Sequence, residues 1–471
     1  MKENIGFLNL KLLIIFLLMP IYLNFIYNLF NENFRLPYLS IINFLVSFFC
    51  FILLFLIGKI ISKIFKLKQK SVAIVLYLMS FYVFNFLSLI FIELSFNIIF
   101  FVVNIIWFLL AIKDATTNFL KTELFSVFIL VGVLRVLVSS KFNFNLISNS
   151  RFNPSFSWDV DYFWYPMTEV IFNSSLQEAI YENIIPGYGL MTHYIHALLA
   201  KLFFGFEQFV FFETVSHTYL LLFCLFIYEL DLKTPSKLLV VSLVISIFLN
   251  SDWLSYLFLS SLMGEGMTAV FFSIIFYYII NFRTNNLSPK NILILFIFSF
   301  IYFTKPFLSY IFFVGYLLLT YKSKRSIYLL LGLSGVLLNE IIYSLKFIDK
   351  TSNNYINKET FYGVLNNLNI NSVKNIFINV IETDKIISYL ILGYLILNIV
   401  LFANKYKFSI YEKINNLLLI LNLFLIVILY STVWQTIEVG SAYRYIVVTL
   451  PLLFINIGHI FNKYTMRKQF F

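Results

Sequence analysis

The chain has 471 residues, of which 61% are hydrophobic and 12% are charged, and its mean hydropathy is +0.88. A water-soluble domain of this size cannot bury so much apolar surface, so the composition excludes a soluble globular protein and predicts a membrane protein. The formal net charge of +11 comes from short basic clusters between apolar runs, which excludes nucleic acid as the expected partner.

The apolar runs have the length of membrane helices. Most are about 17 to 25 residues long and lack strand-like alternation, as a helix crossing about 30 Å of hydrocarbon requires. We therefore expect an all-α, polytopic transmembrane helical bundle in which residues 1–471 form a single integral membrane domain. The predicted number of membrane segments is about 13 to 16.

Basic clusters predict the orientation, because Lys and Arg are enriched in cytoplasmic loops. The clusters are Lys59, Lys63, Lys66, Lys68 and Lys70; Lys322, Lys324 and Arg325; Lys405, Lys407 and Lys413; and Lys463, Arg467 and Lys468. Both termini are then cytoplasmic. The expected location is a bacterial inner or plasma membrane.

The first spans follow in order. We expect an uncleaved first helix near 7–30, a second near 37–62, and two helices within 71–112 that turn near Glu93. A further span near 122–140 then crosses the membrane to the extracytoplasmic side.

The next segment, 141–185, is predicted to be an extracytoplasmic loop. It contains "SFSWDVDYFWYP", in which Asp159 and Asp161 lie among aromatic rings. Such rings prefer the lipid headgroup region, and a partly desolvated carboxylate there gains proton affinity, as a general base needs. Pro166 begins a short amphipathic helix, "MTEVIF", that carries Glu169 as a further acid.

Three shorter segments, 186–204, 208–228 and 236–262, include candidate half-helices. The first follows a Pro-Gly turn and places His193 and His196 on one helix face, three residues apart. This spacing favours hydrogen bonds to a polar ligand or to neighbouring helices over a metal site.

In the second half of the chain, the spans continue to alternate between the cytoplasmic and the extracytoplasmic side. The expected spans are 265–282, 290–304, 306–322, 326–343, 386–403, 414–434 and 443–461, with a second extracytoplasmic loop at 344–385. This order places three polar interruptions, "MGEGM", "FTKPF" and "GSAYRY", outside with the Asp159 loop. We therefore expect one extracytoplasmic site.

Each interruption carries an ionisable residue of the kind that usually serves a site in a bilayer. Glu265 lies between two glycines, where a ligand can approach the backbone. Lys305, at a helix break before a proline, is a candidate ligand of a phosphate group. Arg444 can hold two phosphate oxygens at once.

In this order, "SWDVDYFWYPMTEVIF", "IIPGYGLMTHYIHAL", "LMGEGMTAVFF", "FTKPFLSYI" and "SAYRYIVVTLPLLF" resemble the successive motifs of the GT-C glycosyltransferase superfamily, including its RgtA/B/C/D-like and family 39-like bacterial members. The resemblance covers roughly residues 155 to 455. It implies a donor sugar on a polyprenyl phosphate, transfer at the extracytoplasmic face, and inversion at the anomeric carbon.

The resemblance also implies residue roles. Asp159, Asp161 and Glu265 would be catalytic, and Asp159 and Asp161 are also the candidate ligands of a divalent metal, Mg²⁺ or Mn²⁺. The expected substrate-binding residues are Trp158, Trp164, Glu169, Tyr188, His193, Lys305, Tyr443 and Arg444. The chain departs from the family in two ways: about five spans precede the acidic loop, and Glu265 replaces the usual Asp.

The expected partners are the lipid-linked donor, membrane lipid, and a glycan, lipid or protein acceptor. Two other functions are compatible with the sequence. A lipid-linked polysaccharide polymerase or ligase would rely on arginines more than on acids, here Arg135, Arg151 and Arg444. Broken helices at 263–267 and 303–307 would suit a transporter or flippase.

Overall fold

The structure, a computed structural model, describes eleven parts of the chain. They are residues 41–114, 164–183, 189–203, 214–250, 264–282, 288–304, 309–347, 374, 378, 385–432 and 448–467. Within them, every regular element is a helix, which confirms the all-α prediction for this part of the chain.

The helices follow the predicted spans closely. In the first half they are α2 (Ile41–Phe65), α3 (Lys70–Ser88), α4 (Phe96–Asp114), α7 (Tyr165–Asn173), α8 (Leu176–Glu182), α9 (Met191–Phe203), α11 (Thr214–Glu229) and α12 (Thr234–Asn250). In the second half they are α14 (Gly264–Ile280), α15 (Pro289–Ser299), the 3-10 helix η3 (Phe300–Phe303), α16 (Ser309–Ser323), α17 (Ile327–Lys346), α20 (Lys385–Ala403), α21 (Ile410–Thr432) and α23 (Leu450–Arg467). The predicted turn at Glu93 is confirmed as the link between α3 and α4.

Three of these helices are long and apolar enough to cross a membrane: α3 and α20 with 19 residues each, and α17 with 20. The total number of spans stays a prediction, because the predicted spans near 7–30 and 122–140 lie outside the described residues. The described part of the 141–185 loop consists of the short helices α7 and α8, the first of which is the helix expected after Pro166.

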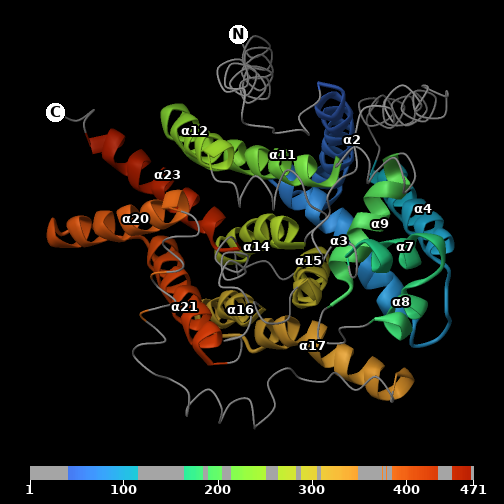
Figure 1. The fold of residues 1–471 in the computed structure, drawn as a ribbon. Coiled ribbons are helices and arrows are strands. Elements are labelled where there is room, and N and C mark those ends of the chain that lie inside the picture. The colour runs from blue at the N-terminus through green and yellow to red at the C-terminus, as the bar shows by residue number, and fades with distance from the viewer. Residues whose placement is uncertain are drawn as a thin grey trace.

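The bundle has a buried centre and apolar flanks (Figure 1). α14 lies between the α20, α21 and α23 group and the group formed by α4, α7, α8 and α9. Almost all of α14 is buried, whereas α20 exposes Leu392, Ile396, Ile399 and Phe402. Outward apolar side chains are stable when lipid surrounds them, so this pattern agrees with a helical membrane protein.

Hydrogen bonds between different helices hold several turns together at one end of the bundle. The carboxylate of Glu229, at the end of α11, accepts hydrogen bonds from the first backbone amides of α3, Lys70 N (2.8 Å) and Ser71 N (2.9 Å). Lys290, at the start of α15, donates to the carbonyl of Ile64 at the end of α2 (2.6 Å). The α2–α3, α11–α12 and α14–α15 turns therefore lie together.

Further contacts extend this end. Lys322, in the last turn of α16, donates to the last carbonyl of α14, that of Ile280 (3.0 Å). Asn462 near the end of α23 accepts from Lys233 N, just before α12 (2.8 Å). Lys463 reaches Glu412 at the start of α21 (2.7 Å).

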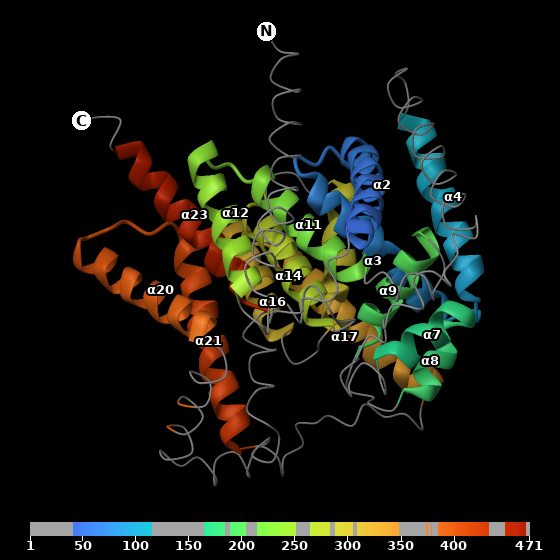
Figure 2. The same cartoon turned by 45° about the horizontal axis from the view of Figure 1, so that its top comes forward.

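We call this face the basic end; it is made by the three turns named above, the end of α16, the segment between α20 and α21, and the end of α23. It gathers the described members of all four predicted basic clusters. Figure 2 shows the end of α23 at the top and α7 and α8 at the opposite end, which the sequence predicts to be extracytoplasmic and which we call the outer end.

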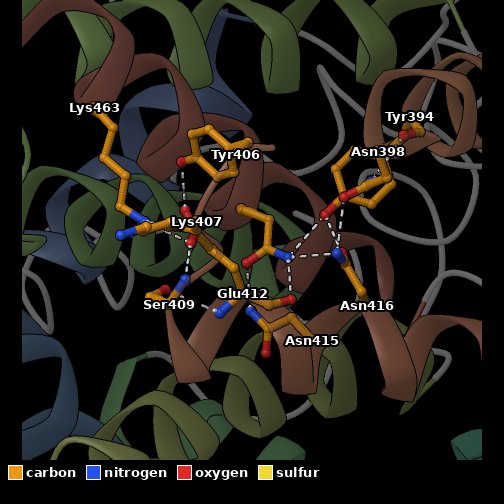
Figure 3. Close-up of polar contacts among 10 residues, drawn as sticks. Tyr394, Asn398, Tyr406, Lys407, Ser409, Glu412, Asn415, Asn416 and Lys463 are labelled. Carbon is orange, nitrogen blue, oxygen red and sulfur yellow. Dashed lines mark hydrogen bonds and ion pairs between the residues drawn. The ribbon is translucent and has the colours of Figure 1, made fainter. Parts of the chain in front are cut away.

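A polar network fastens α20, α21 and α23 to one another (Figure 3). Asn456 of α23 donates to Tyr394 Oη (2.8 Å) and to Asn416 Oδ1 (3.1 Å), and it accepts from Asn415 Nδ2 (2.9 Å). Asn416 in turn donates to Asn398 of α20 (2.8 Å). These amide bonds join the three helices, although Asn415 Oδ1 is buried without a hydrogen-bond partner among the described residues.

Candidate functional site

The side chain of Trp164 links several segments of the chain at the outer end. It is one of the largest fully buried side chains, and its indole stacks on the imidazole of His193, with ring centroids 4.4 Å apart and planes inclined by 23°. His193 Nδ1 lies 3.3 Å from the carbonyl oxygen of Trp164, and the hydroxyl of Thr168 donates to that same oxygen (2.6 Å). The end of the acidic loop is thereby joined to the start of α9.

The first residue of α14 completes this contact. A Cβ on Gly264 would lie 2.7 Å from Cη2 of Trp164 and 2.8 Å from Cγ2 of Thr192. Glycine is therefore required for α14 to approach both the indole and α9 so closely. The start of α14 and the tryptophan that precedes α7 therefore meet here.

Glu265 lies directly beside this contact, in the first turn of α14, and it is fully buried. The amino end of a helix carries a partial positive charge, which favours a carboxylate at this position. Thr268, one turn further, donates its hydroxyl back to the carbonyl of Gly264 (2.7 Å). Glu265 thus lies one residue beyond the glycine that contacts Trp164.

A second set of polar groups lies deeper, between α9, α11 and α14. The His196 and Tyr219 rings are 6.0 Å apart, and Tyr219 contacts Phe271 of α14 edge to face. Among the described residues, Thr192 Oγ1, both ring nitrogens of His196 and Tyr219 Oη have no hydrogen-bond partner, although all are buried. Such groups cost free energy unless water or a ligand satisfies them, so this set can bind hydroxyl groups.

The "FTKPF" interruption also reaches the outer end. A Cβ on Gly189, just before α9, would overlap the carbonyl oxygen of Phe303 at the end of η3. Thr304 follows, buried, with its hydroxyl bonded to the carbonyl of Ile301 (2.7 Å). Lys305 is the next residue of the chain, but it lies outside the described residues.

Four predicted site residues lie in the described part of the chain. Trp164, His193 and Glu265 come together as above, and Glu169 lies half-buried on α7. Trp164 and His193 are buried against each other, so their observed contacts are with the protein. The other predicted site residues lie outside the described residues: Asp159, Asp161, Trp158, Tyr188, Lys305, Tyr443 and Arg444. The prediction of a divalent metal at Asp159 and Asp161 falls in this second group.

Sequence reasoning did not single out Thr192 or Tyr219. The spacing of Thr192 and His196, four residues apart on one helix face, is a signal that could have identified the first. No sequence signal connects Tyr219 to them, since it lies on a different helix.

The chain was compared with family models, curated proteins and solved structures, and no match was found. The likeness to GT-C glycosyltransferases therefore depends on the motifs of the sequence.

Proposed function

We propose that the chain is an integral membrane glycosyltransferase of the GT-C type. It transfers a sugar from a polyprenyl-phosphate donor to a glycolipid, polysaccharide or protein acceptor at the extracytoplasmic face, with inversion of the anomeric carbon.

The observation that supports this proposal best is the meeting of three motif segments at the outer end. Trp164, the Gly189–His193 segment and Gly264–Glu265 are far apart in the sequence, yet their side chains and backbones are in contact. The basic end lies at the other side of the bundle. A buried carboxylate, Glu265, and orphan polar groups lie beside the meeting point, as a site for a hydroxyl-rich ligand requires.

The proposed reaction is a single displacement. Asp159 takes the proton of the acceptor hydroxyl while its oxygen forms a bond to the anomeric carbon. The bond from that carbon to the phosphate oxygen breaks, and polyprenyl phosphate leaves with the electron pair. Lys305 and Arg444 stabilise the negative charge of the leaving phosphate, which is the largest electrostatic contribution in a low-dielectric site.

In this mechanism, Glu265 is the second acid. It is buried, one residue beyond the glycine that contacts Trp164. Trp164 positions the acidic loop, because its indole is fixed between His193 and Gly264.

The test is sugar transfer by the purified chain in proteoliposomes, with a radiolabelled polyprenyl-phosphate sugar and a glycolipid acceptor. Asp159→Asn and Glu265→Gln should each lower the rate by at least about a hundredfold, because removal of an acid-base group typically costs that much. Asp231→Asn makes the same chemical change in an exposed turn at the basic end and should leave the rate unchanged.

Other outcomes identify other functions. Full activity of Asp159→Asn, with activity lost in the alanine variants of Arg135, Arg151 and Arg444, would indicate a polymerase or ligase. Uptake of solute without a covalent product would indicate a transporter. Either result would refute the proposed glycosyl transfer.

A further inference from the structure

Three lysines have an unusual backbone conformation. Lys66, Lys324 and Lys405 have φ angles of 55°, 55° and 54°, and among the described residues they are the non-glycine residues with positive φ. This left-handed region is sterically unfavourable for a residue with a Cβ, so glycine or asparagine usually occupies it.

All three lysines occupy the same structural position, one or two residues beyond the end of a helix. Lys66 follows α2, and the next amide, Leu67 N, returns to the carbonyl of Ser62 (2.8 Å). Lys405 follows α20 in the same way, with Tyr406 N bonded to the carbonyl of Leu401 (2.9 Å). Lys324 follows α16. The first two are helix-ending motifs in which glycine is strongly preferred.

Asparagine is abundant in this chain, and Asn404 directly precedes Lys405. Lysine nevertheless takes the left-handed position each time. Three separate helix ends thus place a cation where glycine or asparagine is preferred.

Four other lysines of the basic end have internal partners. Lys70 pairs with Glu229, Lys290 and Lys322 donate to helix carbonyls, and Lys463 pairs with Glu412. Lys66, Lys324 and Lys405 differ. They are exposed, and their ammonium groups make no ion pair, hydrogen bond or ring contact within the described part of the chain. The paired lysines stabilise the fold, whereas Lys66, Lys324 and Lys405 are free to bind a partner outside it.

We propose that Lys66, Lys324 and Lys405 bind the phosphate groups of anionic phospholipids in the cytoplasmic leaflet. Each lies at the basic end of an apolar helix, where anionic headgroups are found and attract lysine side chains. The negative end of each helix also favours a cation here. The lipid supplies the further stabilisation that offsets the left-handed backbone.

Substitution of the lysines by glycine gives a sharp test, because glycine keeps the left-handed backbone while the cationic side chain is removed. The triple variant Lys66→Gly, Lys324→Gly, Lys405→Gly is compared with the wild-type chain in detergent micelles. Thermal unfolding midpoints are measured with added phosphatidylglycerol and with added phosphatidylcholine. The wild-type midpoint should be higher in phosphatidylglycerol, and the glycine variant should lose most of that difference.

The matched control is Lys68→Gln, Lys407→Gln, Lys413→Gln, which removes three other exposed cations from the same end. It should keep more than half of the lipid-dependent difference. A triple arginine variant at the three left-handed positions should keep nearly all of it. Native mass spectrometry should show fewer retained phosphatidylglycerol molecules on the glycine variant than on the control.

Two results would overturn the proposal. Equal losses in the glycine and control variants would mean that the general charge of the face attracts lipid. A glycine variant that changes stability by the same amount in both lipids would mean that the lysines act only on the helix ends.

Discussion

Gly264 permits a close contact at the outer end, because the indole of Trp164 and the methyl group of Thr192 occupy the space next to its Cα. Both neighbours are themselves buried and fixed, Trp164 by its stacking on His193. A methyl group at position 264 would therefore displace the indole, and with it the end of the acidic loop. Gly393 on α20 offers a contrast, since a Cβ there would meet nothing within 4 Å.

We predict that Gly264→Ala destabilises the protein by about 1 to 3 kcal/mol, as overpacking of a core commonly does. It should also reduce sugar transfer at least tenfold, because the indole positions the acidic loop. Gly393→Ala should lower neither stability nor sugar transfer, because alanine favours a helix interior over glycine. Unfolding in denaturant and transfer assays on both variants measure this, and equal behaviour of the two variants would contradict the assigned contact.

Glu412 links the start of α21 to the end of α23. It lies ahead of the predicted span 414–434, and its side chain is fully buried. Burial raises the pKa of this carboxyl group, but hydrogen bonds from Lys463 and Ser409 outweigh burial and lower the pKa below its ordinary value. The charged form is thus favoured in the folded state.

The lowered pKa predicts how stability depends on pH. A carboxyl group with a lower pKa in the folded state contributes stability above its unfolded pKa and loses it as the pH falls through the folded value. The wild-type unfolding midpoint should therefore fall more steeply than that of Glu412→Gln between about pH 5 and about pH 3. Parallel curves for the two proteins would show that Glu412 does not stabilise this link.

The elements were predictable to different degrees. The turn at Glu93 and the starts of α14 and α20 follow from hydropathy and glycine, which act locally along the chain. The stacking of Trp164 on His193 did not follow, because it joins residues whose approach is set by helix packing. Tyr219 was missed for the same reason: its neighbour His196 lies on another helix, and no periodic pattern connects them.

At the scale of the whole molecule, the two ends differ in chemistry. The basic end gathers lysines from turns spread over the chain, and the outer end gathers aromatic and buried polar groups. The distribution of Lys and Arg in the sequence predicted this division, because charge bias acts on each loop separately. The charge bias did not predict which helices become neighbours within the bundle.

The division of the two ends predicts labelling by a membrane-impermeant maleimide in intact cells. In a background with Cys50→Ala and Cys224→Ala, Phe91→Cys and Glu182→Cys should be labelled, since both positions are exposed at the outer end. Lys68→Cys and Lys407→Cys should react only after the membrane is opened. The reverse pattern would invert the topology and remove the outer end from the extracytoplasmic face.

The bond between Glu229 and the start of α3 has a consequence for biosynthesis. The partners lie 159 residues apart, so the amides of Lys70 and Ser71 emerge long before the carboxylate that binds them. At a synthesis rate of about 5 to 20 residues per second, the delay is roughly 10 to 30 s. During that interval water must satisfy these amides, and a nascent chain arrested before residue 229 would leave this helix start open to hydrogen exchange.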